Sequence, residues 1–180
     1  MTRIKEFRDG LTQEIIDEKF SWINKADIED AIIGAEYSRL IWYDGIWKNG
    51  TWKDGYWKNG TWENGTWENG TWGNGIWEDG IWEYGWWYDG VWKNGTRKNG
   101  TWEKGTWGNG IWYKGTWKNG TWKDGTWKNG TWENGSWVDG TWEFGRWVDG
   151  RWWTGTWKNG LWKDGTWHRT AERRRSVHAA

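Results

Sequence analysis

The sequence predicts an all-β fold of the β-solenoid class, and three observations support this. From residue 41 to residue 165 a five-residue unit, Thr-Trp-Lys/Glu-Asn/Asp-Gly, repeats 25 times without insertion or deletion. A short fixed period is typical of stacked repeats, in which each unit contacts an equivalent unit of the next turn. Counting Trp167 in the broken last unit, 25 of the 28 Trp residues occupy the second place of the unit, where Arg97 is the single exception. Every full unit ends in Gly, which permits a sharp corner of the backbone.

Alternation along a strand assigns each position of the unit a direction. If Trp points inward, the Thr before it and the Lys or Glu after it point outward, and Asn or Asp lies at the corner. Pairing third-position residues three units apart gives eight opposite-sign and two like-sign pairs, whereas units four apart give six and three, and adjacent units three and eight. We therefore expect units to stack three or four apart, so that three or four units complete a coil.

The alternative fold is an antiparallel β-meander of short strands. Asn-Gly and Asp-Gly favour two-residue type I′ turns, and the W-x-N-G spacing resembles that of MORN repeats. In an antiparallel ladder, however, residues two apart bond to the same neighbouring strand. A meander with a tight turn at both ends of each unit requires Thr and Lys to bond to different neighbours. The solenoid has no such conflict, and it is the predicted fold.

Read from its glycine, the unit Gly-Thr-Trp-Lys-Asn resembles that of the pentapeptide-repeat family, and residues 26–30 (Ala-Asp-Ile-Glu-Asp) match that family more closely. The resemblance implies a right-handed quadrilateral β-helix with four units per coil. Here Trp replaces the usual Leu or Phe and Gly the usual Ala, so four indoles would need a wider bore. Runs such as GTWKNGTWKDG also look like Trp-rich repeat proteins of tailed phages and bacteria.

The chain divides into four segments. Residues 1–25 contain Leu11, Ile15, Phe20 and Ile23 at helical spacing, which predicts a short N-terminal helix acting as a cap or an anchor. Residues 26–40 form a transition into the array, which occupies residues 41–167. Residues 168–180 form a basic tail that we expect to be disordered.

The indoles are expected to form the core, because an exposed row of 25 would far exceed the apolar patches that soluble proteins tolerate. Arg97 interrupts them, which predicts either a bend in the coil or a cation–π contact with Trp92 or Trp102. Arg97 is therefore a candidate interaction site. Outward aromatic side chains are the other candidates: Trp86, Tyr88, Tyr113 and Trp153.

Charge and composition narrow the function. The 25 basic and 25 acidic residues balance and are interleaved, so nucleic acid and anionic membranes are disfavoured as partners. There is no Cys, and no apolar stretch approaches the length of a membrane span. The two histidines, His168 and His178, lie in the tail, and no nucleophile motif is present, so we expect no catalytic residue, cofactor or metal site.

These features favour a non-enzymatic structural or interaction protein. The resemblance to phage repeat proteins suggests a virion component such as a spike, fibre, decoration or spacer. Its N-terminal region would anchor it to other structural proteins or mediate self-association. A virion or cytoplasmic location is expected rather than Sec-dependent secretion, because no apolar signal segment follows Met1. The alternative is a carbohydrate-binding or adhesion module that uses exposed Trp and Tyr to bind surface glycans.

Overall fold

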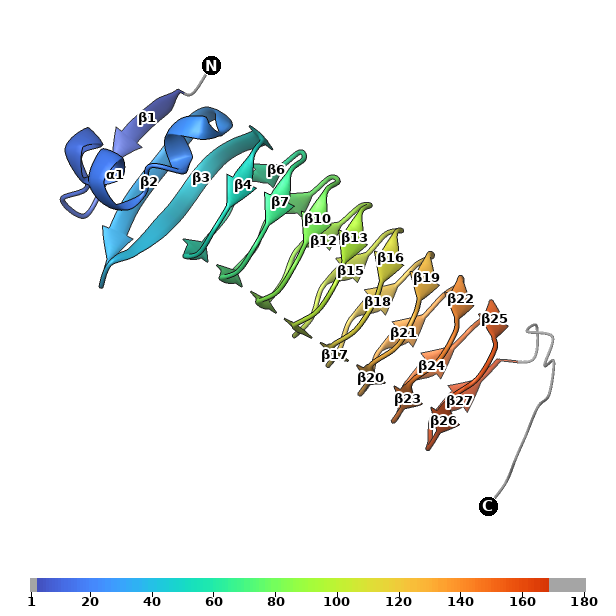
Figure 1. Ribbon diagram of the computed structural model, residues 1–180. Helices are drawn as coiled ribbons and strands as arrows, with labels where there is room; N and C mark the ends of the chain where they lie inside the picture. The colour runs from blue at the N-terminus through green and yellow to red at the C-terminus, as the bar shows by residue number, and fades with distance from the viewer. Residues whose placement is uncertain (1–2, 169–180) are drawn as a thin grey trace.

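The computed structural model describes residues 3–168, which form an elongated parallel β-solenoid with a small N-terminal cap (Figure 1). Each short strand pairs in parallel with the strand fifteen residues later, as in the register Trp57↔Trp72. Fifteen residues are three units, so each coil has three sides and the cross-section is triangular. The predicted solenoid is confirmed. The quadrilateral coil of four units implied by the pentapeptide-repeat resemblance and the antiparallel meander are both wrong for this array.

The three sides of the solenoid are named here faces A, B and C. Face A contains β3 (Arg39–Asn49), β5 (Tyr56–Trp57), β8 (Thr71–Trp72), β11 (Trp86–Trp87), β14 (Thr101–Trp102), β17 (Thr116–Trp117), β20 (Thr131–Trp132), β23 (Arg146–Trp147) and β26 (Leu161–Trp162). Face B shares β3 and continues with β6 (Thr61–Trp62), β9 (Ile76–Trp77), β12 (Val91–Trp92), β15 (Thr106–Trp107), β18 (Thr121–Trp122), β21 (Ser136–Trp137), β24 (Arg151–Trp152) and β27 (Thr166–Trp167). Face C contains β4 (Thr51–Trp52), β7 (Thr66–Trp67), β10 (Ile81–Trp82), β13 (Thr96–Arg97), β16 (Ile111–Trp112), β19 (Thr126–Trp127), β22 (Thr141–Trp142) and β25 (Thr156–Trp157).

The core consists of three columns of stacked indoles, one column behind each face. Trp107 and Trp122, one coil apart on face B, have ring centroids 4.8 Å apart and planes within 5° of parallel. Between columns the rings meet edge to face, as Trp117 and Trp122 do at 6.0 Å and 73°. Both arrangements are ones that aromatic quadrupoles favour. Three indoles per coil already exclude water, since Trp122 is 0% exposed, and this explains why the coil closes with three sides.

The corners between faces are built from the last two residues of each unit. At many of these corners the side-chain oxygen of the Asn or Asp accepts a hydrogen bond from the following Gly N–H, as Asp124 Oδ1 does from Gly125 at 2.7 Å. The corner glycines of the array have φ between +107° and +141°, a region that residues with a Cβ rarely adopt. These glycines also stack directly on one another: a methyl group on Gly110 would overlap the carbonyl oxygen of Gly95.

The N-terminal cap joins the array through an antiparallel strand pair. β2 (Asp27–Glu36) pairs antiparallel with β3, and the turn between them places Tyr37 and Ser38 at φ of 49° and 66°. β1 (Ile4–Phe7) pairs in parallel with β2. The unit at residues 26–30, which most resembles a pentapeptide repeat, thus belongs mainly to this hairpin and not to a coil. By pairing with β3, β2 covers the first strand of the solenoid, which would otherwise be an open edge.

The predicted short helix is present and packs on the end of the core. α1 (Gln13–Lys19) begins after Thr12, whose hydroxyl accepts a hydrogen bond from the Ile15 N–H at 3.3 Å. A 3₁₀ turn, η1 (Ile23–Lys25), follows it. Between them Trp22 lies 5.1 Å from the Trp52 ring, so the aromatic core continues into the cap.

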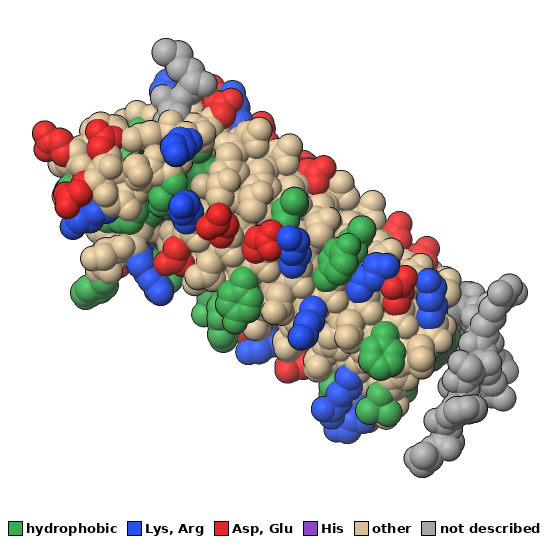
Figure 2. All heavy atoms as spheres, viewed as in Figure 1, with side chains coloured by type: hydrophobic (Ala, Val, Ile, Leu, Met, Phe, Trp, Pro, Cys, Tyr) green, Lys and Arg blue, Asp and Glu red, His purple; other side chains and the backbone are tan. Residues whose placement is uncertain are grey.

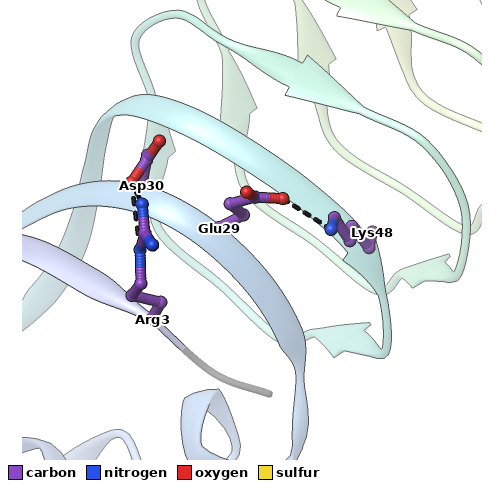
Figure 3. A network of polar contacts seen from close by, with 4 residues as sticks. All are labelled: Arg3, Glu29, Asp30 and Lys48. Carbon is purple, nitrogen blue, oxygen red and sulfur yellow. Dashed lines mark hydrogen bonds and ion pairs between the residues drawn. The ribbon is translucent and has the colours of Figure 1, made fainter.

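Ion pairs join the three strands of the cap (Figure 3). The Arg3 guanidinium contacts the Asp30 carboxylate, and Lys48 Nζ lies 2.5 Å from Glu29 Oε2. These pairs are exposed to solvent, which screens them, so they contribute little to stability. They fix β1 and β3 against β2.

The basic tail predicted at residues 168–180 lies outside the described residues, apart from His168. Within the described chain, neither helical segment has the length and apolar character needed to cross a membrane.

Candidate interaction surface

The first and third residues of each unit form two outward columns on every face. Charged third-position residues pair along these columns at the fifteen-residue spacing. Lys93 and Glu78 approach to 2.8 Å, and Lys118 and Glu103 to 2.9 Å. The opposite charges that stand three units apart in the sequence therefore form ion pairs in the structure. The array presents a surface on which both signs alternate, and Figure 2 shows hydrophobic groups lying among these charges on the visible side.

Glu143 illustrates the electrostatics of these columns. It lies between Lys128 and Lys158, at 3.0 Å and 3.1 Å. Hydrogen bonds from the two ammonium groups lower the pKa of the Glu143 carboxyl from its ordinary value. The arrangement is that of a solvated ion-pair ladder, in which the two lysines favour the ionised form of Glu143.

Of the four predicted outward aromatics, the structure brings two together on face A. Trp86 is the first residue of β11 and Tyr88 is the residue after this strand, so the two flank the inward Trp87. Their ring centroids are 6.4 Å apart and their planes are 28° from parallel. Tyr84, at the corner before them, is 53% exposed. Lys118 Nζ lies 5.7 Å from the Trp86 ring centroid. One short stretch of chain thus presents three exposed aromatic rings.

The other two predicted aromatics lie on different faces. Tyr113 follows β16 on face C and is 47% exposed. Trp153 follows β24 on face B, where it stacks on His168 with centroids 4.0 Å apart and donates its Nε1–H to Ser136 Oγ at 3.0 Å. These two rings therefore do not join the pair on face A.

A shallow hollow lies on face A, over β3, β5 and β8. It has a volume of about 340 Å³ and is lined by Glu36, Ile41, Tyr56, Lys58, Thr71 and Gly73, among others. At one edge of the hollow, Thr71 and Gly73 occupy the two outward columns at β8. β5 carries Tyr56 in the column of Thr71, whereas Trp86 of β11, also in this column, lies outside the hollow and near Lys118. Gly73 replaces the usual charged residue and so leaves the third-position column open beside Lys58.

Tyr56 is held in a fixed orientation at the edge of this hollow. Arg39 Nη1 donates a hydrogen bond to the Tyr56 hydroxyl at 3.0 Å, and the guanidinium carbon lies 5.4 Å from the ring centroid. Arg39 also lies 3.7 Å from Asp54 Oδ2. The Tyr56 ring is thus held by Arg39.

Sequence reasoning missed the roles of Tyr56 and Gly73, although both depart from the repeat. Tyr56 stands where Thr is usual and Gly73 where Lys or Glu is usual. They become neighbours only when the sequence is written in rows of fifteen, because Tyr56 pairs with Thr71. The signal was present, but the number of units per coil was needed to use it.

Arg97, the remaining candidate, lies inside the core. It is 0% exposed, and its guanidinium carbon is 4.1 Å from the Trp112 ring centroid and 5.7 Å from that of Trp82. The cation–π contact is therefore present, but with the residues one coil away and not with Trp92 or Trp102. The expected bend is also absent, since β13 pairs in register with β10 and β16. Arg97 cannot bind a surface partner in this position.

Burial makes the Arg97 guanidinium an unusually weak base. Nη1 reaches the Gly100 carbonyl oxygen at 3.5 Å. Desolvation lowers the pKa of Arg97 to about 9. In the described chain it is the one charged residue in the core, and we interpret it as a weak point of the stack.

Replacing Arg97 with Trp is expected to raise the free energy of unfolding by about 2 kcal/mol or more, because it restores two stacked contacts and removes a buried charge. The difference in unfolding free energy between Arg97→Trp and the wild type should become smaller as the pH rises. The folded-state pKa is depressed, so above about 9 the unfolded wild type binds more protons than the folded one, and its stability rises with pH. Guanidinium chloride unfolding of both proteins below and above pH 9 measures this. A difference that stays constant with pH would contradict a buried, titrating Arg97.

No cluster of three or more His, Asp or Glu able to hold a metal ion occurs among residues 3–168. No family model, curated protein or solved structure matches this chain.

Proposed function

We propose that this protein is a rigid, non-enzymatic spacer that holds an interaction surface at a fixed distance from its N-terminal cap. The observation that carries the proposal is the unbroken fifteen-residue register of the array. Face C alone contributes eight strands in consecutive pairing, which at a strand spacing of roughly 4.8 Å gives a rod on the order of 38 Å long.

The indole columns support rigidity. A core residue such as Trp122 has stacked neighbours 4.8 Å away on both sides, Trp107 and Trp137, so bending the rod would open these contacts. Interiors packed in this way resist deformation. A long, stiff and electrically balanced rod suits a structural role in an assembly. The resemblance to Trp-rich phage repeats makes a virion one setting for it.

The N-terminal cap is the proposed point of attachment. The apolar side of α1 is already used inside the molecule, since Ile16 and Phe20 are buried. Attachment would therefore involve the hairpin, where Tyr37 at the turn is 93% exposed, and β1, where Phe7 is 41% exposed. Exposed aromatic residues at a tip are effective anchors for another protein or a second copy.

The spacer hypothesis predicts a narrow distance between the two ends of the array. Because the chain lacks Cys, spin labels can be placed at Thr51→Cys and Thr156→Cys, on the first and last strands of face C, and measured by double electron–electron resonance. Seven strand spacings separate these sites, so the backbone distance should be about 33 Å. A broad distribution would contradict a rigid spacer.

A length variant provides the control. Deleting residues 116–130 removes one whole coil and should shorten the labelled distance by about 4.8 Å while leaving the distribution narrow. Deleting only residues 116–120 would instead rotate all later units by one face and move Thr156 off face C. If both deletions change the distance alike, the three-sided rod is wrong.

A further inference from the structure

We propose that the indole columns conduct one-electron oxidising equivalents along the solenoid, between the partly buried Trp22 at the cap and the last coil of the array. The oxidant is a one-electron acceptor that reaches the cap, and the final electron donor is a small thiol that reaches the last coil. This activity goes beyond the spacer function, which requires only a stiff array. It rests on the continuity of the stack, its isolation from water and the weak basicity of the groups around it.

The indole stack is continuous from the cap to the last coil. Trp22 contacts Trp47 and Trp52 at centroid distances of 6.3 Å and 5.1 Å. From Trp47 to Trp167, every step along the column behind face B measures between 4.7 Å and 5.1 Å. Electron transfer between aromatic rings slows steeply with distance, so a series of such short steps is much faster than one jump across the array.

The stacked rings are isolated from solvent everywhere except at the two ends. From Trp42 to Trp152, every inward indole is at most 1% exposed. The partly buried indoles of the stack are those at its ends: Trp22, Trp157, Trp162 and Trp167. Electrons can therefore leave the stack at the cap and enter it at the last coil, whereas outside molecules cannot reach the rings in between.

The groups around the buried rings keep an oxidised indole in its mobile form. An oxidised indole is a radical cation, and loss of its Nε1 proton would turn it into a neutral radical that stays where it forms. Trp142 Nε1–H donates to the Asn159 carbonyl oxygen at 3.1 Å, and a peptide carbonyl is too weak a base to take this proton. Within residues 3–168 the core holds no carboxylate, and its one charged side chain is Arg97. The radical cation therefore passes to the next ring instead of being trapped.

This core already accommodates a positive charge at one position. The Arg97 guanidinium carbon lies 4.1 Å from the Trp112 ring centroid and 5.7 Å from that of Trp82. Indole faces attract cations through their quadrupole, which offsets part of the cost of removing a charge from water. Arg97 itself has no oxidisable ring, and it repels a second positive charge nearby. Conduction past this coil therefore uses Trp87 and Trp92.

At the last coil the oxidised ring meets water. Because its three indoles are partly exposed, an oxidised ring there transfers its Nε1 proton to water and becomes a neutral indolyl radical. The thiol then gives this radical a hydrogen atom, which restores the indole and leaves a thiyl radical. In the whole reaction the oxidant at the cap gains one electron, the thiol loses one electron and one proton, and the array is unchanged.

The lack of Cys in the chain allows a photo-oxidant to be attached at one chosen position. Lys53→Cys, at an exposed position directly after Trp52, carries a ruthenium polypyridyl label that is oxidised by flash and quench. In air and without thiol, indolyl radicals become stable oxidised tryptophans, which mass spectrometry of tryptic peptides locates. We expect oxidation at the last coil. Isotope-labelled protein without ruthenium, mixed into the sample, measures transfer between molecules and should stay unoxidised.

The coil of Arg97 offers a place to cut the ladder. Trp87→Phe together with Trp92→Phe leaves this coil with no indole, and phenylalanine keeps the aromatic packing but is far harder to oxidise. In every column the nearest remaining indoles are then two strand spacings apart, about 9.6 Å, and oxidation of the last coil should fall at least tenfold.

The same two substitutions in another coil provide the matched control. Trp117→Phe together with Trp122→Phe leaves Trp127 in place, and this ring is stacked 4.8 Å from the indoles of the coils before and after it. The column behind face C then bridges the altered coil. Oxidation of the last coil should therefore remain close to that of the wild type.

A third variant restores the path. Arg97→Trp, added to Trp87→Phe and Trp92→Phe, returns one indole to the cut coil and should return oxidation of the last coil to nearly the wild-type level. The proposal is overturned if the last coil of the wild type is not oxidised, if the two double variants are oxidised alike, or if Arg97→Trp restores nothing. Rigidity is measured separately by the spin-label distance, so either proposal can fail without the other.

Discussion

Replacing Trp122 with Ala is expected to lower the free energy of unfolding by about 3–5 kcal/mol, the usual range for deleting a buried aromatic side chain. Trp122 is 0% exposed and lies between Trp107 and Trp137, with both ring centroids 4.8 Å away. Two further indoles meet it edge to face. Because its neighbours are large and stacked, they cannot collapse into the space, and the cavity remains.

The matched control is the adjacent residue. Lys123→Glu reverses an exposed charge whose neighbours one coil away, Gly108 and Val138, are uncharged, so we expect a change within about 0.5 kcal/mol. Denaturation followed by circular dichroism compares the two variants with the wild type. Equal effects at Trp122 and Lys123 would mean that the indole does not point into the core.

Replacing Gly110 with Ala is expected to be at least as damaging, at more than about 3 kcal/mol. Two separate effects act at this position. Gly110 has φ +117°, which an alanine rarely adopts, and its new methyl group would overlap the carbonyl oxygen of Gly95 in the coil before it. Relief would require the coils to separate, which would weaken the strand pairing on both sides of the corner.

Gly73→Ala separates these effects from the general properties of glycine. Gly73 has no positive φ, and a Cβ there would lie 3.0 Å from the Trp57 carbonyl oxygen, a tight contact that a small shift relieves. Most other units carry Lys or Glu at the same place. The melting temperature should therefore fall steeply for Gly110→Ala and change little for Gly73→Ala. Similar losses in the two variants would contradict the proposed role of the glycine corners.

The period, the inward tryptophans and the short helix were predictable because each follows from local rules repeated along the chain. The number of units per coil could not be predicted. It depends on how the large indoles pack together in the interior of the solenoid, which neither residue volume nor the period determines. The cation–π partners of Arg97 depended on this number, as did the meeting of Tyr56 with Gly73. Once the coil is known to contain fifteen residues, the partners of Arg97 and the proximity of Tyr56 to Gly73 both follow from the sequence.

The cap was harder to predict for a different reason. Tyr37 and Ser38 form the turn of the β2–β3 hairpin at positive φ, a conformation for which Asn and Gly are the usual signals. The turn is imposed by tertiary contacts, above all the pairing of β2 with β3 over the first coil. A unit such as Ala26–Asp30 can resemble a repeat and still be used as a strand of the cap.

The indole columns also have a spectroscopic consequence. Rings stacked 4.8 Å apart, as Trp107 and Trp122 are, are close enough for electronic excitation to pass between them before emission. Ultraviolet light absorbed anywhere in the array therefore migrates along the columns, and the emitted light loses the polarisation of the exciting beam. Arg97 is the single interruption, and it affects only the column behind face C. The fluorescence of the folded protein is accordingly a property of the whole ladder of chromophores and not of individual tryptophans.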